Sequence, residues 1–225
     1  MQCMLVDFDG VILRNHGASK FIANRCQNFV QIKTNTHTRY TKFLNENLYT
    51  TTGHSLLGLH KLGYNQYTIQ EFNEYVYGDI QYESMFKDIR KTNAHDIQQF
   101  TNLNEWCKHN NTKLFIFSNA PDEWCLNICK LMSRKLEDIE TTNIILKNRF
   151  LKPSNDAYTV LDYHLRNYKK IVNIDDKLMN LLPTVDNERW EHYLLTDRND
   201  TFPISHNLYV IQELDEVVCK SHSSE

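Results

Sequence analysis

Three short apolar runs that each end in polar residues constrain the fold of this chain most strongly. They are MLVDFDGVIL at residues 4–13, KLFIFSNA at residues 113–120 and KIVNIDD at residues 170–176. Each run is too short for an independent helix and is rich in β-branched or aromatic residues, which is typical of buried strands. Long stretches with helical spacing separate the runs, so the pattern predicts parallel strands covered by helices on both faces.

The polar ends of these runs predict a functional site. In open parallel sheets, ligands bind beyond the carboxyl ends of the strands. Two neighbouring carboxylates repel each other unless a cation or a proton lies between them, and carboxylates around a divalent metal are a common arrangement for phosphoryl chemistry. The polar residues at the three ends are Asp7, Asp9, Ser118, Asn119, Asp175 and Asp176.

The spacing of the runs predicts one α/β core with an insertion. The chain has 225 residues, of which 41% are hydrophobic, enough for a substantial core. Roughly a hundred residues separate the first two runs, too many for one crossover helix, and their apolar spacing is helical. We interpret residues 14–91 as a helical subdomain inserted in a core of residues 1–13 and 92–225.

Further core elements are expected on both sides of the second run. HDIQQFTNLNEWCKHNN predicts a helix that packs on the core, and PDEWCLNICKLMSRKLEDI predicts another, which opens on a proline and two acids. HYLLTD and NLYVIQEL, near the end of the chain, are possible additional strands.

Composition excludes several classes of protein. The net charge is −3 and no basic block is present, so nucleic acid is disfavoured as a generic partner. No basic segment precedes an apolar stretch at the start, and no window has the length of a membrane span, so we expect a soluble cytoplasmic protein. Six scattered cysteines without CxxC pairs indicate neither a zinc site nor a disulfide framework. No pattern indicates an oligomeric state.

Asp7 and Asp9 suit phosphoryl transfer. Aspartate is a known nucleophile that forms an aspartyl-phosphate, so Asp7 is a candidate for the attack on phosphorus. Asp9 is a candidate for giving a proton to the leaving oxygen and later taking one from water. Gly10 allows a sharp turn behind the two acids.

These residues resemble the motifs of the haloacid dehalogenase superfamily of phosphatases. Its first motif is a strand ending in Asp-x-Asp-Gly, which DFDGV at residues 7–11 matches. LFIFSNA, FLKPSNDAY and IVNIDDKLMN resemble the second, third and fourth motifs, in the family's order. The resemblance spans residues 4 to about 183. It implies an α/β fold with a Rossmann-like three-layer core, a central parallel sheet and an inserted helical cap.

The resemblance also implies roles. Ser118 would bind the phosphoryl group with help from the backbone N–H of Asn119, and Lys152 would neutralise phosphate charge and steady Asp7. Mg²⁺ would be held by Asp7, the backbone carbonyl of Asp9 and the acidic pair, whose direct ligand stays open. The expected catalytic residues are Asp7, Asp9, Ser118 and Lys152; the expected substrate-binding residues are Gly10, Ser118, Asn119 and Lys152; the expected metal ligands are Asp7, Asp9, Asp175 and Asp176.

Two features refine this expectation. The residue after the acidic pair is usually small in the superfamily, whereas here it is Lys177. Within the insertion, NLYTTTGHSLLGLHKLG resembles the cap of pyrimidine 5'-nucleotidase-like members, and the matching positions are Tyr49, Gly53, Gly58 and Leu59. Ordinary amphipathic helix packing accounts for the same pattern equally well.

The expected function is a Mg²⁺-dependent phosphomonoesterase that acts through an aspartyl-phosphate. Its substrate would be a small phosphorylated metabolite such as a nucleoside 5'-monophosphate. Two alternatives stay open: a sugar phosphomutase of the same superfamily, and a catalytically slow scaffold that binds a macromolecular partner. Asp9 favours phosphate transfer over dehalogenation, because dehalogenating members lack this second aspartate.

Overall fold

The core of the protein is a parallel sheet. The structure is a computed structural model that describes residues 1–14, 16–136, 139–141, 150–197 and 206–221. Within these ranges six strands pair in the order β3-β2-β1-β4-β5-β6, and every pair is parallel. The strands are β1 (Gln2–Val6), β2 (Thr112–Ile116), β3 (Glu140–Thr141), β4 (Lys170–Asp175), β5 (Trp190–Leu195) and β6 (Leu208–Ile211). The three apolar runs thus form adjacent central strands, and the predicted α/β fold class is confirmed.

Helices fill the connections between the strands. Between β1 and β2 lie α1 (His16–Thr34), α2 (Thr38–Thr52), α3 (Ser55–Lys61), α4 (Ile69–Tyr77), α5 (Tyr82–Met85), α6 (Ile89–Thr92) and α7 (Ala94–His109). After β2 come α8 (Asp122–Met132), a single 3₁₀ turn at Arg134–Leu136, α10 (Asn155–His164), α11 (Leu178–Leu181), a second 3₁₀ turn at Leu182–Thr184, and α12 (Asp215–Ser221).

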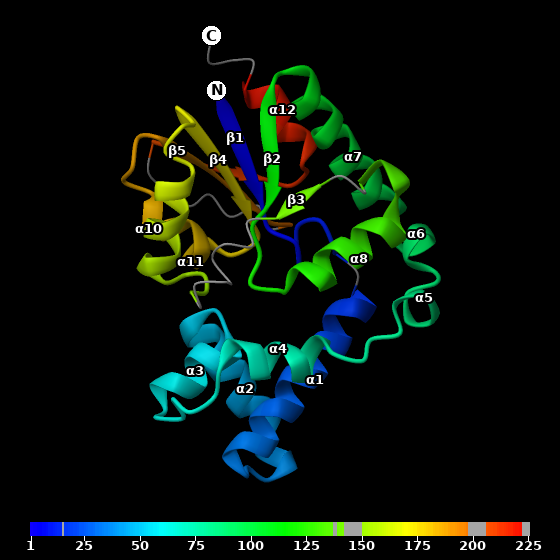
Figure 1. Cartoon of the computed structure of the whole chain (residues 1–225), viewed down its shortest axis with the longest axis vertical. Helices are drawn as coiled ribbons and strands as arrows, with labels where there is room; N and C mark the ends of the chain where they lie inside the picture. The colour runs from blue at the N-terminus through cyan, green and yellow to red at the C-terminus, as the bar shows by residue number, and fades with distance from the viewer. Residues whose placement is uncertain (15, 137–138, 142–149, 198–205, 222–225) are drawn as a thin grey trace.

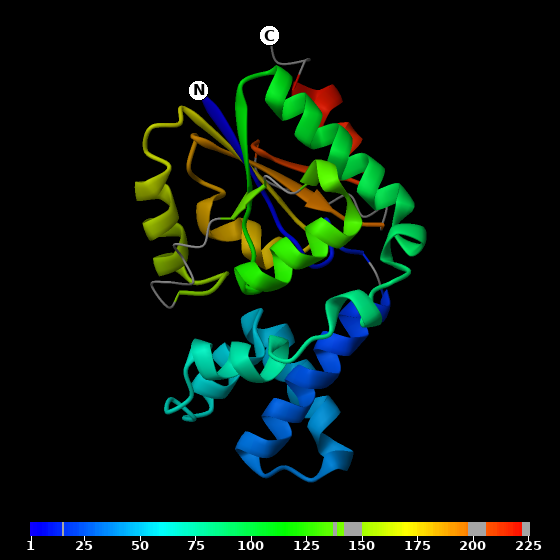
Figure 2. The same ribbon diagram turned by 45° about the vertical axis from the view of Figure 1, so that its right-hand side comes forward.

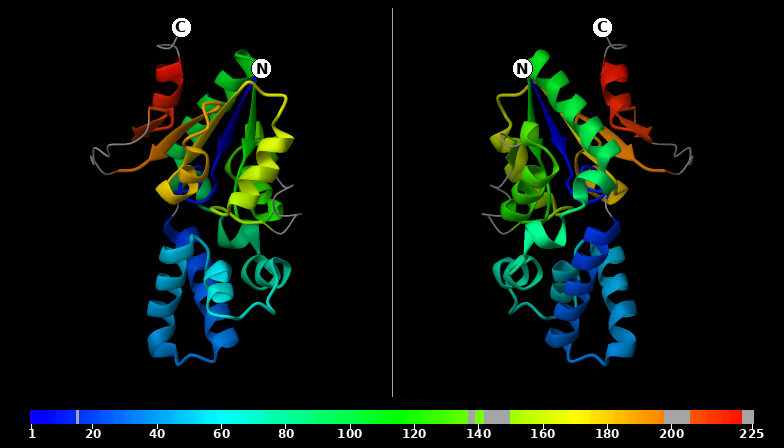
Figure 3. Two further views of the ribbon diagram at one scale, coloured as in Figure 1. Left: turned by 90° about the vertical axis from the view of Figure 1, so that its left-hand side faces the viewer. Right: turned by 90° about the vertical axis from the view of Figure 1, so that its right-hand side faces the viewer.

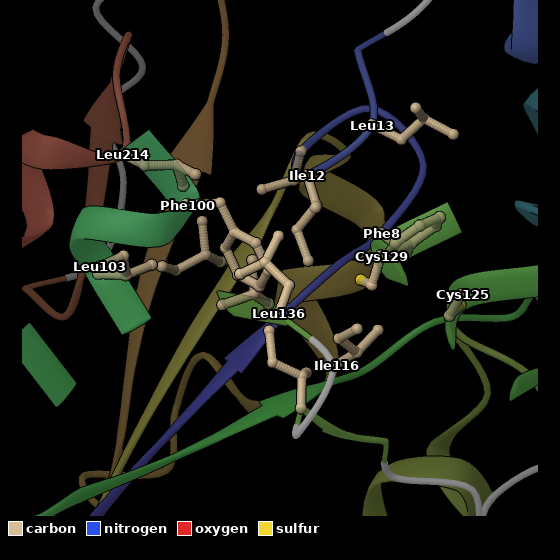
Figure 4. Packing of buried hydrophobic residues seen from close by; sticks show 14 of the residues in the cluster. Phe8, Ile12, Leu13, Phe100, Leu103, Ile116, Cys125, Cys129, Leu136 and Leu214 are labelled. Atoms are coloured by element: carbon tan, nitrogen blue, oxygen red, sulfur yellow. The ribbon is translucent and has the colours of Figure 1, made fainter. Parts of the chain in front are cut away.

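The alternation of side chains along β1 divides the core into two layers. Met4 and Val6 belong to the larger apolar cluster, which α7, α8 and α12 complete, whereas Cys3 and Leu5 pack with α10 on the other face. Successive side chains of a strand point to opposite faces, so a strand that is apolar throughout is buried on both. Figure 1 shows α10 and α11 on one side of the sheet and α7 and α8 on the other, and Figure 4 shows part of the larger cluster.

The strand order places a topological switch between β1 and β4. From β1 the chain continues to β2 and β3 on one side, and then returns to β4 on the other side of β1. The register pairs Val6 with Ile174, and the backbone N–H of Asp7 donates to the carbonyl of Ile174 over 2.9 Å. Asp7 and Asp175 therefore lie side by side at the switch, where ligands bind in such sheets.

Helices α1 to α4 form a helical body beyond the carboxyl ends of the strands (Figures 1 and 2). They share an apolar cluster that includes Phe29, Leu48, Leu56, Phe72 and Val76. The N-terminus and α12 lie at the opposite end of the sheet (Figure 3). We call the α1–α4 body the cap. Residues further along, such as Phe86 and Ile89, instead join the core cluster; the division of the chain into residues 14–91 and the remainder stays a prediction.

The helix after β2 is shorter than its sequence pattern predicts, and the described cysteines form no disulfide. The helix expected over PDEWCLNICKLMSRKLEDI ends at Met132, because Ser133 adopts an extended backbone and a 3₁₀ turn follows; residues 137–138 lie outside the described residues. The five cysteines whose side chains are described are free thiols, Cys125 and Cys129 among them.

In the described part of the chain, no helix has both the length and the apolar character that crossing a membrane requires.

Gly58 tests the packing of the cap. A Cβ at this position would lie 2.5 Å from Cβ of Leu48 on α2, and 2.9 Å from its Cα. We expect Gly58→Ala to lower the free energy of unfolding by about 1–3 kcal/mol, because the two helices would have to separate. Thr50→Ala, at an exposed position of α2, is the matched control and should change it by less than about 0.5 kcal/mol. Urea unfolding measures the free energy of unfolding of both variants. Equal stability of Gly58→Ala and Thr50→Ala would contradict the close contact between Gly58 and Leu48.

Candidate active site

A cavity of about 410 Å³ separates the carboxyl ends of the strands from the cap. Its floor carries residues that follow β1, β2 and β4, together with Lys152 from the segment before α10, and its roof comes from α1, α2, the α2–α3 turn, the start of α3 and α4. The floor residues are Asp7, Asp9, Gly10, Ser118, Asn119, Ala120, Lys152, Asp176, Lys177 and Asn180. The cavity therefore gathers the predicted site residues, apart from Asp175, which lies directly behind them.

The Lys152 ammonium is the centre of the floor. Its Nζ lies 2.7 Å from Asp175 Oδ2, 2.8 Å from the carbonyl oxygen of Phe117 and 2.9 Å from Asp7 Oδ1. The side chain is only 2% exposed. Burial alone would lower the pKa of Lys152, but the carboxylates of Asp175 and Asp7 outweigh burial and raise it. An ammonium has three N–H donors, and three oxygens already surround this one.

The two acids at the end of β4 lie in different environments. Both carboxylate oxygens of Asp175 are engaged: Oδ1 accepts from the backbone N–H of Lys177 over 2.9 Å, Oδ2 faces Lys152, and Asn180 Nδ2 donates to both. Asp176 Oδ1, in contrast, is buried without a hydrogen-bond partner among the described residues. Burial raises the pKa of Asp176 to about 7. Asp176 is thus the member of the pair that is left to bind something else.

Asp9 is held by an indole. Trp124 Nε1, on α8, donates to Asp9 Oδ1 over 3.2 Å. Burial, and then the negative charge of Asp7, raise the pKa of Asp9 to about 7, against the opposing effect of the Trp124 hydrogen bond. A carboxyl with this pKa holds and releases a proton near neutral pH, as a general acid and base must.

Asp7 itself is anchored through one oxygen. Its Oδ1 accepts from the backbone N–H of Phe8 over 2.8 Å and faces Lys152, whereas Oδ2 has no hydrogen-bond partner among the described residues. Burial raises the pKa of Asp7, and Lys152 counters that effect. The side chain lines the cavity, so one carboxylate oxygen is fixed while the other stays available for chemistry.

The turn after β2 positions a hydroxyl donor. Ser118 Oγ accepts from the backbone N–H of Ala120 over 3.0 Å, and within the described ranges its hydroxyl hydrogen has no acceptor, so it can donate into the cavity. The Asn119 side chain is committed elsewhere, because it exchanges two hydrogen bonds with the backbone of Lys152. Asn119 thereby ties the end of β2 to the segment that carries Lys152.

Gly10 leaves room for an acid. It has a φ of +102°, a left-handed conformation that glycine adopts without strain, and a Cβ there would lie 2.5 Å from Asp176 Oδ2. Gly10 is needed both for the turn and for the close approach of Asp176.

The residues present fit a divalent cation. Asp7, Asp175 and Asp176 each offer an oxygen within 4.8 Å of the others. Asp7, Asp9 and Asp176 line the floor and Asp175 lies behind it, whereas the ammonium groups beside them are those of Lys152 and Lys177, so carboxyl groups outnumber ammonium groups. Hard cations such as Mg²⁺ prefer oxygen ligands. Asp176 Oδ1, which has no hydrogen-bond partner among the described residues, is such an oxygen.

The cap positions matched in the sequence divide into two groups. Tyr49 and Gly53 line the cavity, whereas Gly58 packs against Leu48 and Leu59 is buried in the cap cluster. Ordinary helix packing therefore accounts for the Gly58–Leu59 pair. His54 also lines the cavity, and its Nδ1 accepts from the backbone N–H of Leu56 over 3.2 Å. Burial, aided by the Lys177 charge, lowers the pKa of His54 to about 3, so the ring is neutral.

Sequence reasoning missed several residues of the site. The sequence pattern places Trp124 in a helix that packs on the core and does not distinguish Asn180 from other polar residues. The Phe117 carbonyl has no side-chain signal at all. Trp124 had one possible signal, because it follows the proline and two acids that begin α8, directly behind the second motif.

Comparison with known proteins identifies the fold. No family model matches the chain, and no curated protein matches it. Solved structures do: a haloacid dehalogenase (HAD) phosphatase from Thermococcus onnurineus is 14% identical, covers 98% of both chains and has a TM-score of 0.55. L-2-haloacid dehalogenase from Xanthobacter autotrophicus is 10% identical, covers 99% of both and has a TM-score of 0.54. A β-phosphoglucomutase candidate from Thermotoga maritima is 14% identical, covers 100% of both and has a TM-score of 0.52.

The fold is that of the haloacid dehalogenase-like hydrolases, and the Rossmann-like core with its central parallel sheet is as the motifs implied. Proteins named as a phosphatase, a dehalogenase and a β-phosphoglucomutase share this fold, so the fold alone does not select one reaction.

The Lys152 network predicts a pH-dependent loss of stability. Lys152→Met leaves two buried carboxylates facing each other, and we expect a loss of about 3–5 kcal/mol at pH 8, measured with EDTA present. Burial already raises the folded-state pKa of Asp7 above its unfolded value, and the substitution raises it further. A carboxyl raised in this way favours the folded state at low pH, so the loss should be smaller at pH 5.

The matched control is Lys169→Met at an exposed position, which should change the free energy of unfolding by less than about 0.5 kcal/mol. An equal loss for Lys152→Met at both pH values would show that the two carboxylates do not depend on the ammonium.

Proposed function

We propose that this protein is a Mg²⁺-dependent phosphomonoesterase of small phosphorylated metabolites and works through phospho-Asp7. The observation that carries the proposal is the state of the Asp7 carboxylate, with Oδ1 held by Phe8 N–H and Lys152 and Oδ2 without a partner among the described residues. A nucleophile must be held in place with one oxygen available. The HAD phosphatase from Thermococcus onnurineus, with the same fold, supports the reaction class.

The residues account for both halves of the reaction. Asp7 Oδ2 attacks phosphorus, and the bond from phosphorus to the leaving oxygen breaks while Asp9 gives that oxygen a proton. Water then attacks phospho-Asp7, Asp9 takes the proton of the water, and inorganic phosphate leaves with Asp7 restored. The pKa of Asp9, raised to about 7 mainly by burial, suits both roles. Ser118 donates to a phosphoryl oxygen through its free hydroxyl hydrogen.

Mg²⁺ would be held by Asp7, the backbone carbonyl of Asp9 and Asp176, and when bound it neutralises negative charge on the phosphoryl group. Asp176 is the favoured direct ligand of the acidic pair, because the oxygens of Asp175 are engaged by Lys152, Asn180 and a backbone N–H. Asp175 is then a positioning residue, which holds Lys152 and through it Asp7.

The cavity supports a small substrate with an uncharged leaving group. Its volume of about 410 Å³ is in the range of small-molecule sites. The cap contributes apolar or neutral lining residues such as Ile22, Phe72 and His54, and one carboxylate, Glu46, which is exposed. A nucleoside 5'-monophosphate meets this description, since its charge lies on the phosphate, and it is the substrate that the cap resemblance implies.

The primary test is release of inorganic phosphate from a panel of phosphomonoesters that includes pyrimidine and purine nucleoside 5'-monophosphates and hexose phosphates. We expect turnover with Mg²⁺, none with EDTA, and a loss of at least about a thousandfold in Asp7→Asn, because the nucleophile is removed. Asp186→Asn, at an exposed position, is the control for a lost carboxylate. A folded protein that releases no more phosphate than Asp7→Asn would refute the proposal.

A second test distinguishes the roles of Asp175, at the end of β4, and Asp176, which follows it. Asp176→Asn should weaken Mg²⁺ binding at least about tenfold in calorimetric titration of EDTA-treated protein, because it replaces a direct carboxylate ligand. Asp175→Asn should act mainly on stability, since it breaks the buried pair with Lys152. Unchanged Mg²⁺ affinity in Asp176→Asn would remove this residue from the metal site.

A further inference from the structure

Two lysine ammonium groups lie at the floor of the cavity, and they differ in how many of their N–H groups are already hydrogen-bonded. Lys152 is surrounded by the oxygens of Asp7, Asp175 and Phe117, which account for its three N–H groups. A phosphomonoester brings up to about two negative charges at neutral pH. Lys152 could donate to a phosphoryl oxygen only by giving up one of these partners, so an ammonium with N–H groups to give would add a donor that neither Lys152 nor bound Mg²⁺ supplies.

Lys177 is the other lysine that lines the cavity within the described ranges. Its backbone N–H is bound to Asp175 Oδ1, which anchors the residue at the end of β4. The Nζ atom lies 3.9 Å from Asp176 Oδ1 and 4.9 Å from the centre of the Tyr49 ring. The first distance is too long for a hydrogen bond, and the second is that of a cation–π contact. The Tyr49 side chain is also a hydrogen-bond partner of this ammonium. The ammonium is therefore held between floor and roof, and its remaining N–H donors have no hydrogen-bond partner among the described residues.

The positive charge of Lys177 acts on the carboxyl groups of the floor. It is among the groups that lower the pKa of Asp7, Asp9 and Asp176, against the larger raising effect of burial on each. A lysine side chain is charged at neutral pH. Lys177 lines the cavity together with Asp7, Asp9 and Asp176, the groups that would surround a transferring phosphoryl group.

We propose that the Lys177 ammonium donates to a non-bridging oxygen of the phosphoryl group, while the Tyr49 ring steadies it from the cap. This assigns a phosphate-binding role to a position where the superfamily usually has a small residue. The role in turnover rests on the proposed phosphomonoesterase function, but the contact itself can be measured with inorganic phosphate. A lysine that also contacts Tyr49 links phosphate binding to the contact between cap and core.

The test is calorimetric titration of inorganic phosphate into the full chain with Mg²⁺ present. Lys177→Gln keeps a polar side chain and removes the charge, and we expect it to bind phosphate at least about tenfold more weakly than the natural chain, as the loss of a charged hydrogen bond predicts. Lys177→Arg keeps the charge and should bind within about threefold. Lys20→Met, which removes an exposed charge from α1, should leave the affinity unchanged.

Mg²⁺ titrations of the same variants exclude an indirect effect. Removing a positive charge 3.9 Å from Asp176 Oδ1 lessens repulsion of a cation, so Lys177→Gln should bind Mg²⁺ at least as tightly as the natural chain. Thermal unfolding checks that each variant is folded. If Lys177→Gln does not fold, loss of phosphate binding in folded Tyr49→Leu supports the proposal, and unchanged binding there overturns it.

The proposal is overturned if Lys177→Gln binds phosphate as tightly as the natural chain, or if the natural chain does not bind phosphate. It is also overturned if the variant changes only the preference for substrates with a second anionic group, because Lys177 would then contact the leaving group. Failure of the proposed function would give a different result. Phosphate binding would still depend on Lys177, but the protein would release phosphate from no substrate.

Discussion

The candidate site depends on one buried ammonium. Lys152 joins Asp7 after β1, Asp175 at the end of β4 and the Phe117 carbonyl after β2, within 2.7–2.9 Å of each oxygen. Neighbouring parallel strands bring the two carboxylates together at the switch point of the sheet, where they would repel each other without a cation between them. The ammonium therefore makes the convergence of the three strand ends electrostatically possible.

That interaction gives four aspartates four different environments. Asp175 is engaged through both oxygens, Asp7 through one, Asp9 by the indole of Trp124, and one buried oxygen of Asp176 has no partner among the described residues. In the proposed mechanism, the same carboxyl group would serve in positioning, nucleophilic attack, proton transfer or metal binding. Environment rather than residue type would distinguish these roles, as in other active sites that carry several acids.

The cap and the core divide the recognition of a substrate between them. Charge is concentrated on the floor, while the inner roof presents neutral and apolar groups such as His54 and Phe72. Lys177 and Tyr49 contact each other across this division. A phosphoryl group on the floor and an uncharged leaving group under the roof would each meet a matching environment, which is the physical basis of the proposed substrate class.

The fold and the gathering of the site were determined largely by the sequence. Apolar runs of strand length, with polar residues at their ends, predict a parallel sheet with those polar residues at one edge, because parallel strands end together. Only the tertiary structure decided that three oxygens surround the Lys152 ammonium, and that one oxygen of Asp176 has no partner among the described residues while both oxygens of Asp175 are engaged. It also decided that Trp124 and Asn180 bond to these acids. These properties depend on distances between side chains far apart in the chain, and hydrophobic patterns encode which face is buried but not which polar atoms meet.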